Sequence, residues 1–130
     1  MTNNSKTHVR EPNANQRPSY KIRTGRKRRQ NIYRYMLLAR SISEKSWLLT
    51  RQGRVLFSMP CDGQESADVA SAYALETNTD FIVPYARSLG AMLVKGMTTQ
   101  EVMLNMFGKA DDPNSGGRQI PIHWDTGNWE

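Results

Sequence analysis

The sequence lacks the features that mark several common classes of small protein. Only one of its 130 residues is a cysteine, Cys61, which excludes an internal disulfide framework and a zinc site built on paired cysteines. Long apolar runs are also missing: the longest stretches, such as residues 35–39, are too short to span a membrane. No apolar run follows the basic start, which argues against a secretory signal peptide. These absences predict a soluble protein from a reducing compartment.

Acidic residues are scarce at the beginning of the chain. Residues 1–30 contain nine Lys and Arg but one acid, Glu11, which gives this segment a formal charge of +8. Residues 31–130 contain nine Lys and Arg against eleven acids, which gives −2, so the net charge of +6 comes from the first segment. The charge distribution therefore predicts a basic tail over residues 1–30 and a nearly neutral domain over residues 31–130.

The basic tail is predicted to be disordered, because its few apolar residues follow no period and Pro12 and Pro18 interrupt it. Residues 21–29 are rich in Lys and Arg, which could neutralise phosphates on nucleic acid or on anionic lipid. The alternative is a solvated leader without a specific partner. Tyr20 is its only stacking residue, and the tail has no amphipathic face, so nucleic-acid binding and a mitochondrial presequence are the weaker interpretations.

The domain after residue 30 has a mostly helical pattern. Apolar residues at three- and four-residue steps from Ile32 to Ile42 predict a helix that ends before Gly53. Asp62 as a cap answered by Glu65 predicts the start of a second helix. Two more helices are predicted at residues 88–95, closed by Gly96, and from the Thr98–Glu101 capping box to Gly108. Residues 55–57 and 81–83 form short β-prone runs, and residues 109–130 have the composition of a loop.

Few residues suggest chemistry by their type and spacing. Cys61 could be a nucleophile, or it could be an ordinary buried thiol. Arg87 follows a Pro-Tyr turn and precedes a predicted helix, so it could bind an anion with help from the helix N-terminus, or it could be a surface arginine. Backbone N–H groups at Gly116 and Gly117 could also receive a phosphate, although paired glycines are common in loops.

Several segments, taken in order, resemble the start of the alpha subunits of thiamine-diphosphate-dependent 2-oxo acid dehydrogenases, in particular the branched-chain type. The matching segments are Tyr33-Arg-Tyr-Met-Leu-Leu-Ala-Arg40, Arg51-Gln-Gly-Arg54 with Phe57, Gly63-Gln-Glu65, Asp80 through Pro84-Tyr-Ala-Arg87 with Gly90, Lys95-Gly-Met-Thr98, and Asp112-Pro113 with Gly117-Arg-Gln-Ile-Pro-Ile-His123. Each segment alone has little specificity, but together and in register over about ninety residues they are specific.

This resemblance implies an oxidoreductase that decarboxylates a branched 2-oxo acid oxidatively and transfers the acyl group to lipoamide. It assigns Arg87, with the adjacent Tyr85 and Ala86, to the diphosphate of thiamine diphosphate. It also assigns a substrate pocket with apolar walls and a polar end. The pocket residues are Phe57, Ile120, Pro121, Ile122 and His123. From their types alone, Phe57 would be interpreted as core packing and His123 as a loop histidine.

The chain departs from the family pattern at two of these positions. Ala86 stands where the family usually has tyrosine, which removes a ring and a hydroxyl beside Arg87. Ile120 stands where the family usually has methionine, a mild change in an apolar wall. The match fades after Trp124, and the family's magnesium-binding segment lies further downstream, so magnesium is implied as a cofactor whose ligands are not in this chain.

The expected fold class is therefore α/β: the amino-terminal, mostly helical part of a thiamine-diphosphate-binding fold. We expect a truncated subunit that is inactive alone, because the family's catalytic glutamate belongs to the beta subunit, the partner in a heterotetramer. The lipoyl-bearing acyltransferase would be a second partner, and the expected location is the cytoplasm, or the mitochondrial matrix in a eukaryote. The alternatives are a non-catalytic fragment that docks on a beta subunit and would co-elute with it, and a nucleic-acid-binding module driven by the basic tail.

Overall fold

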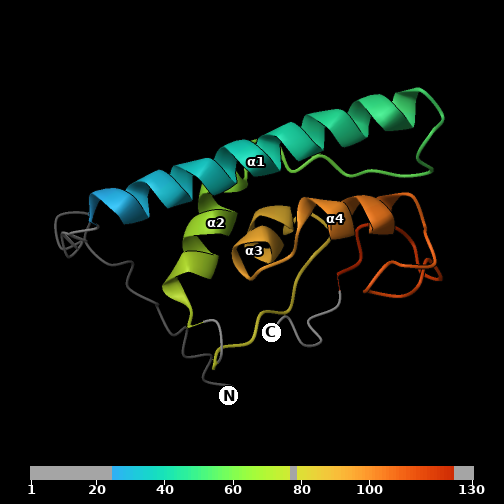
Figure 1. Cartoon of the computed structure of the whole chain (residues 1–130). Coiled ribbons are helices and arrows are strands. Elements are labelled where there is room, and N and C mark those ends of the chain that lie inside the picture. The colour runs from blue at the N-terminus through green and yellow to red at the C-terminus, as the bar shows by residue number, and fades with distance from the viewer. Residues whose placement is uncertain (1–24, 77–78, 125–130) are drawn as a thin grey trace, which may run out of the picture.

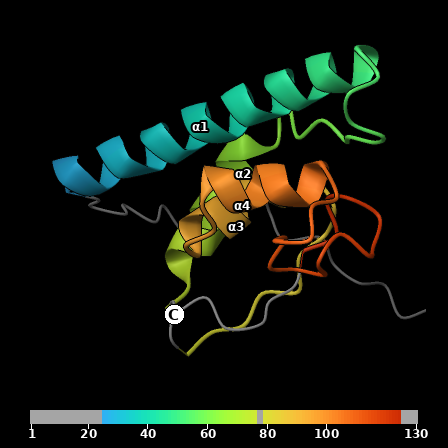
Figure 2. The same cartoon turned by 45° about the vertical axis from the view of Figure 1, so that its right-hand side comes forward.

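The computed structural model describes residues 25–76 and 79–124, and within these ranges the regular structure is helical. The helices are α1 (Arg26–Arg51), α2 (Glu65–Ala74), α3 (Leu89–Val94) and α4 (Thr99–Met106). Figure 1 shows α1 as a long helix lying across the other three, and the turned view in Figure 2 shows these three on the same side of α1. α2 packs against both α1 and α3, and α3 also contacts α1.

Helix α1 begins earlier than the sequence predicted, but it ends where it was predicted to end. The predicted boundary between tail and domain falls inside α1, because residues 26–30 are helical; residues 1–24 of the predicted tail lie outside the described residues. Lys and Arg are good helix formers, and Arg28 adds tertiary support by donating a hydrogen bond to the Tyr73 carbonyl over 2.7 Å. The helix ends before Gly53, whose φ of +68° is easily adopted by glycine.

One face of α1 is buried against the shorter helices. Its buried residues are Ala39, Ile42, Ser43, Ser46 and Leu49. The predicted apolar stripe is confirmed at Ala39 and Ile42, which join a core cluster with residues of α3 and α4 and of the loops, including Met92, Val102 and Ile122. The core therefore lies between α1 and the layer formed by the other helices.

The shorter helices follow the predicted order, with one correction. α3 is preceded by Ser88 and followed by Lys95 and Gly96, as predicted, and the Thr98–Glu101 capping box of α4 is present. The predicted capping by Asp62 is wrong: α2 begins at Glu65 after Gln64, and no side chain caps it. The reason is electrostatic, because Arg40 attracts the carboxylates of both Asp62 and Glu65.

The β-prone runs at residues 55–57 and 81–83 form no strand, and the described part of the chain contains none. The fold is thus helical as far as it is described, and the α/β class remains a prediction. Residues 109–124 form turns and irregular loops, as predicted; residues 125–130 lie outside the described ranges. No helix in the described part is both long enough and apolar enough to cross a membrane.

Candidate functional site

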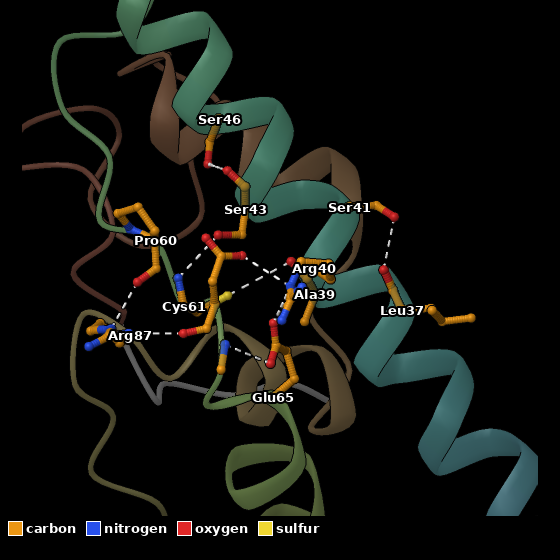
Figure 3. Close-up of polar contacts among 12 residues, drawn as sticks. Leu37, Ala39, Arg40, Ser41, Ser43, Ser46, Pro60, Cys61, Glu65 and Arg87 are labelled. Carbon is orange, nitrogen blue, oxygen red and sulfur yellow. Dashed lines mark hydrogen bonds and ion pairs between the residues drawn. The ribbon is translucent and has the colours of Figure 1, made fainter.

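Arg87 is held at the surface by two backbone carbonyls of a loop between α1 and α2. Its Nε donates to the Pro60 carbonyl over 2.8 Å and its Nη2 lies 3.4 Å from the Asp62 carbonyl (Figure 3). The residue is half-buried, and within the described part of the chain it forms no ion pair. The guanidinium is therefore fixed in direction while its positive charge is not neutralised, which suits the binding of an anion.

The loop that holds Arg87 is itself attached to α1. The Cys61 backbone N–H donates to Ser43 Oγ over 3.1 Å, and the Cys61 thiol lies 3.8 Å from the Ala39 carbonyl. Cys61 is buried in the core cluster, and burial raises the pKa of its thiol. A buried thiol that stays protonated is a poor nucleophile, so the structure favours the packing role for Cys61.

An ion-pair cluster attaches the same loop to α1 where the loop leads into α2. Arg40 on α1 forms a charged hydrogen bond with Glu65, and its Nε also lies 3.1 Å from Asp62 Oδ1 (Figure 3). Glu65 is buried, and its Oε2 accepts a hydrogen bond from the Gly63 N–H over 3.0 Å. The pKa of Glu65 is lowered, chiefly because its side chain accepts the hydrogen bond from Arg40. The cluster thus keeps the Glu65 carboxylate charged inside the fold.

The residues next to Arg87 form a closed turn. The Tyr85 N–H donates to Ser88 Oγ over 3.1 Å, and the Ser88 N–H donates to the Tyr85 carbonyl over 2.9 Å. The Tyr85 side chain is exposed, whereas Ala86 packs against the core cluster. This turn encloses Ala86 and Arg87, so the predicted cofactor-binding triplet lies within one hydrogen-bonded turn.

The predicted substrate-binding residues differ in exposure. Ile120 is 63% exposed and Phe57 is 38% exposed, whereas Ile122 is buried in the core. Pro121 is half-buried and His123 is exposed, with its Nδ1 3.1 Å from the Ile120 carbonyl. Val55 and Ile122 belong to one core cluster, so the segments that carry Phe57 and His123 are tied to a common core.

Ile122 has an unusual backbone conformation for its residue type. Its φ is +63°, a region that β-branched residues rarely adopt. Its backbone N–H donates to Asn105 Oδ1 over 2.7 Å, and its side chain is buried, so packing and hydrogen bonding hold this conformation in place. As the structure places it, Ile122 anchors the loop, while its neighbours Ile120 and His123 face the solvent.

The Asp112 carboxylate accepts many hydrogen bonds in the loop after α4, a role that was not predicted from the sequence. The carboxylate is buried and accepts hydrogen bonds from the side chain of Asn105, and from the backbone and side-chain groups of Asn114 and Ser115. The Gly117 N–H also lies 3.4 Å from Asp112 Oδ2, so this carboxylate already occupies the place suggested for a phosphate. The run Asp-Pro-Asn-Ser-Gly is typical of turns in which an Asp side chain accepts backbone N–H groups, so it could have predicted this role of Asp112.

Metal binding has no visible support within residues 25–76 and 79–124. No group of three or more His, Cys, Asp or Glu side chains in these ranges is arranged to hold an ion.

Comparison with known proteins identifies the family. The family model described as dehydrogenase E1 component matches residues 33–128, which is most of the chain. The chain belongs to this E1 family. The matched range includes every predicted site residue, from Phe57 to His123.

Curated relatives of this E1 chain agree on one type of subunit. It is 50% identical over 94 residues to the 2-oxoisovalerate dehydrogenase subunit alpha of Bacillus subtilis, covering 72% of this chain and 28% of the relative. Mitochondrial alpha subunits are also similar: that of Caenorhabditis elegans is 42% identical over 58% of this chain, and that of Mus musculus 33% over 72%. The resemblance to branched-chain alpha subunits is thereby confirmed.

The E1 chain spans only part of these relatives. It covers 28% of the Bacillus subtilis protein, 17% of the Caenorhabditis elegans protein and 21% of the Mus musculus protein. No solved structure gives a significant match.

Proposed function

We propose that this chain supplies the Arg87 side of a thiamine-diphosphate site in the alpha subunit of a branched-chain 2-oxo acid dehydrogenase. The observation that carries the proposal is the fixed guanidinium of Arg87, held by the Pro60 and Asp62 carbonyls without an ion pair in the described part of the chain. The names of the curated relatives supply the enzyme class.

The environment of Arg87 fits the diphosphate group of such a cofactor. Two of its N–H groups are engaged by carbonyls, which leaves further donors of the planar fork for phosphate oxygens. Tyr85 and Ala86 lie beside it in the closed turn, and we place them next to the diphosphate. When bound, thiamine diphosphate supplies the electron sink for decarboxylation, and the protein supplies binding, orientation and electrostatics.

The substrate would be a small 2-oxo acid with a branched aliphatic chain. We propose that Phe57, Ile120 and Pro121 provide apolar contacts for that chain, and that the exposed His123 meets its polar end. Ile122, being buried, would position this loop rather than form an exposed wall. We propose that the acyl product passes to the lipoyl group of an acyltransferase component.

A beta subunit is the proposed partner, since relatives of this chain are named as alpha subunits. The resemblance assigns the catalytic glutamate to that partner, so we expect no turnover by this chain alone. We place no magnesium ligand on the described residues. Docking on a beta subunit without catalysis is the second candidate, because the relatives are named as alpha subunits and docking requires no bound cofactor.

The test of the proposal is a comparison of cofactor binding by the wild-type chain and by Arg87→Gln. Isothermal titration calorimetry with thiamine diphosphate, in the presence of a purified beta subunit and Mg²⁺, should show affinity falling about tenfold or more, the effect of losing a charge-assisted contact. Arg34→Gln is the matched control, because it removes an exposed positive charge from α1, a different element from the one that carries Arg87. It should bind the cofactor like wild type. Equal affinity of the Arg87→Gln and wild-type chains would contradict the proposal.

A further inference from the structure

We propose that Arg40 is a positioning residue that keeps Arg87 available for an anion by holding the Asp62 carboxylate away from it. The inference rests on the proposed role of Arg87 and assigns a function to a residue on another element. It does not place Arg40 in contact with the cofactor.

Asp62 lies between the two arginines and offers each of them a different group. Its backbone carbonyl is 3.4 Å from Arg87 Nη2, whereas its carboxylate oxygen Oδ1 is 3.1 Å from Arg40 Nε. Figure 3 shows Arg40 and Arg87 approaching the same loop from different elements. Arg87 is thus oriented by a neutral acceptor, and the negative charge of the same residue is directed to Arg40.

The arrangement matters because a carboxylate is a much better partner for a guanidinium than a carbonyl is. A short side chain whose own backbone already touches Arg87 can reach that guanidinium by rotation about its side-chain bonds. If it did so, it would neutralise Arg87 and compete with an incoming diphosphate. Arg40 prevents this competition because it pairs with the Asp62 carboxylate.

Arg40 is itself held in place by a second, buried carboxylate. Glu65 is buried at the start of α2, accepts the hydrogen bond from Arg40 through Oε1 and accepts the Gly63 N–H through Oε2. The pKa of Glu65 is lowered mainly by its hydrogen bond with Arg40, so Glu65 stays charged and fixes the Arg40 fork near Asp62. Asp62, Glu65 and Arg40 thus form one charged cluster, and within the described residues Arg87 lies outside it with no ion pair of its own.

The experiment compares three chains with wild type: Arg40→Gln, Asp62→Asn, and the double variant. Binding of inorganic pyrophosphate and of thiamine diphosphate is measured by calorimetry on the full 130-residue chain with the beta subunit. We expect Arg40→Gln to weaken binding of both probes about tenfold, because Asp62 then pairs with Arg87. The double variant should recover at least most of the wild-type affinity, because the competing carboxylate is gone.

The recovery separates this role from a merely structural one. Both variants that lack Arg40 lose the same ion pair with Glu65, so a folding defect would weaken binding by both equally. Gln at position 40 retains an N–H donor for Glu65, and circular dichroism checks that the helices persist. Asp62→Asn alone should bind at least as well as wild type. A double variant as weak as Arg40→Gln would overturn the inference.

A second readout does not depend on binding of any anion. The ¹⁵N–¹H signal of the Arg87 Nε group, assigned by its loss in Arg87→Gln, reports the hydrogen bond to the Pro60 carbonyl. We expect it to shift in Arg40→Gln and to return toward its wild-type position in the double variant. An unchanged signal in Arg40→Gln overturns the inference. A shift that reverts, with no probe binding to wild type, supports the inference about Asp62 and contradicts the proposed function of Arg87.

Discussion

Single residues decide how closely the helices can approach, and Gly90 is the clearest case. A Cβ atom added at Gly90 would lie 2.9 Å from both Val69 Cγ2 and Asp68 Oδ2 on α2. Asp68 Oδ2 also accepts the Ala91 N–H over 3.0 Å, so the contact between α2 and α3 is both tight and polar. The glycine of the matching family segment thus has a packing reason in this fold.

Gly90→Ala should therefore destabilise the chain by about 1–3 kcal/mol, because overpacking outweighs the better helix propensity of alanine. Urea unfolding followed by circular dichroism measures the change. Gly25→Ala is the matched control, since a Cβ atom there meets nothing within 4 Å. A Gly90→Ala chain as stable as the control would contradict the close approach of α2 and α3.

Asp112 determines the loop after α4 at the same scale. Burial by itself would raise its pKa, but the hydrogen bonds from Asn114, Ser115 and Asn105 outweigh burial and lower it. A carboxyl group whose pKa is lower in the folded than in the unfolded chain stabilises the fold at pH values above its pKa in the unfolded chain, here near 3.8. This stabilisation is lost as the pH falls through the folded pKa.

We predict that Asp112→Asn lowers the free energy of unfolding by about 2–4 kcal/mol near neutral pH. The difference from wild type should shrink as the pH falls below about 3.8 and through the lower pKa of the folded chain, because protonation removes the charge that the hydrogen bonds stabilise. Urea unfolding at several pH values measures this, with Asp111→Asn, an exposed neighbour, as control. A difference that does not change with pH would show that the charge of Asp112 is not what holds the loop.

Whole elements are defined by their ends, and α4 shows this most simply. Thr98 accepts the Glu101 N–H over 3.2 Å, and Glu101 accepts the Thr98 N–H over 2.7 Å, which completes the predicted capping box. Such a box could be predicted because both partners are only three residues apart. At α2 the same spacing failed, because Arg40, distant in sequence, pairs with both acids.

Replacing the cap should destabilise the chain through the loss of one hydrogen bond at the start of α4. Thr98→Ala is expected to cost about 1 kcal/mol, the usual effect of losing a Ser or Thr cap. Thr99→Ala, at the exposed next position, should change stability by less than about 0.5 kcal/mol. Thermal unfolding of the two variants beside wild type provides the comparison, and equal stability of the two would argue against the capping role.

At the scale of the whole molecule, apolar residues are concentrated in a core but also remain exposed. Leu56, Phe81 and Val83 are 95%, 90% and 97% exposed, and all three lie in the runs predicted to be β-prone. A strand needs a neighbour for its backbone hydrogen bonds, and these runs have none within the described residues. Their composition favours strands, yet their conformation here is irregular, and the α/β class stays a prediction.

Local interactions let the sequence determine the helical pattern, the ends at Gly53 and Gly108, the α4 capping box and the loop-like composition after residue 108. The family resemblance also came from residues in order along the chain. Only the tertiary structure decided the surroundings of the candidate site. The pairing of Arg40 with Asp62 and Glu65, the carbonyl support of Arg87 and the burial of Ile122 join residues far apart in sequence. Such contacts depend on how α1 packs over the loops, which no local spacing specifies.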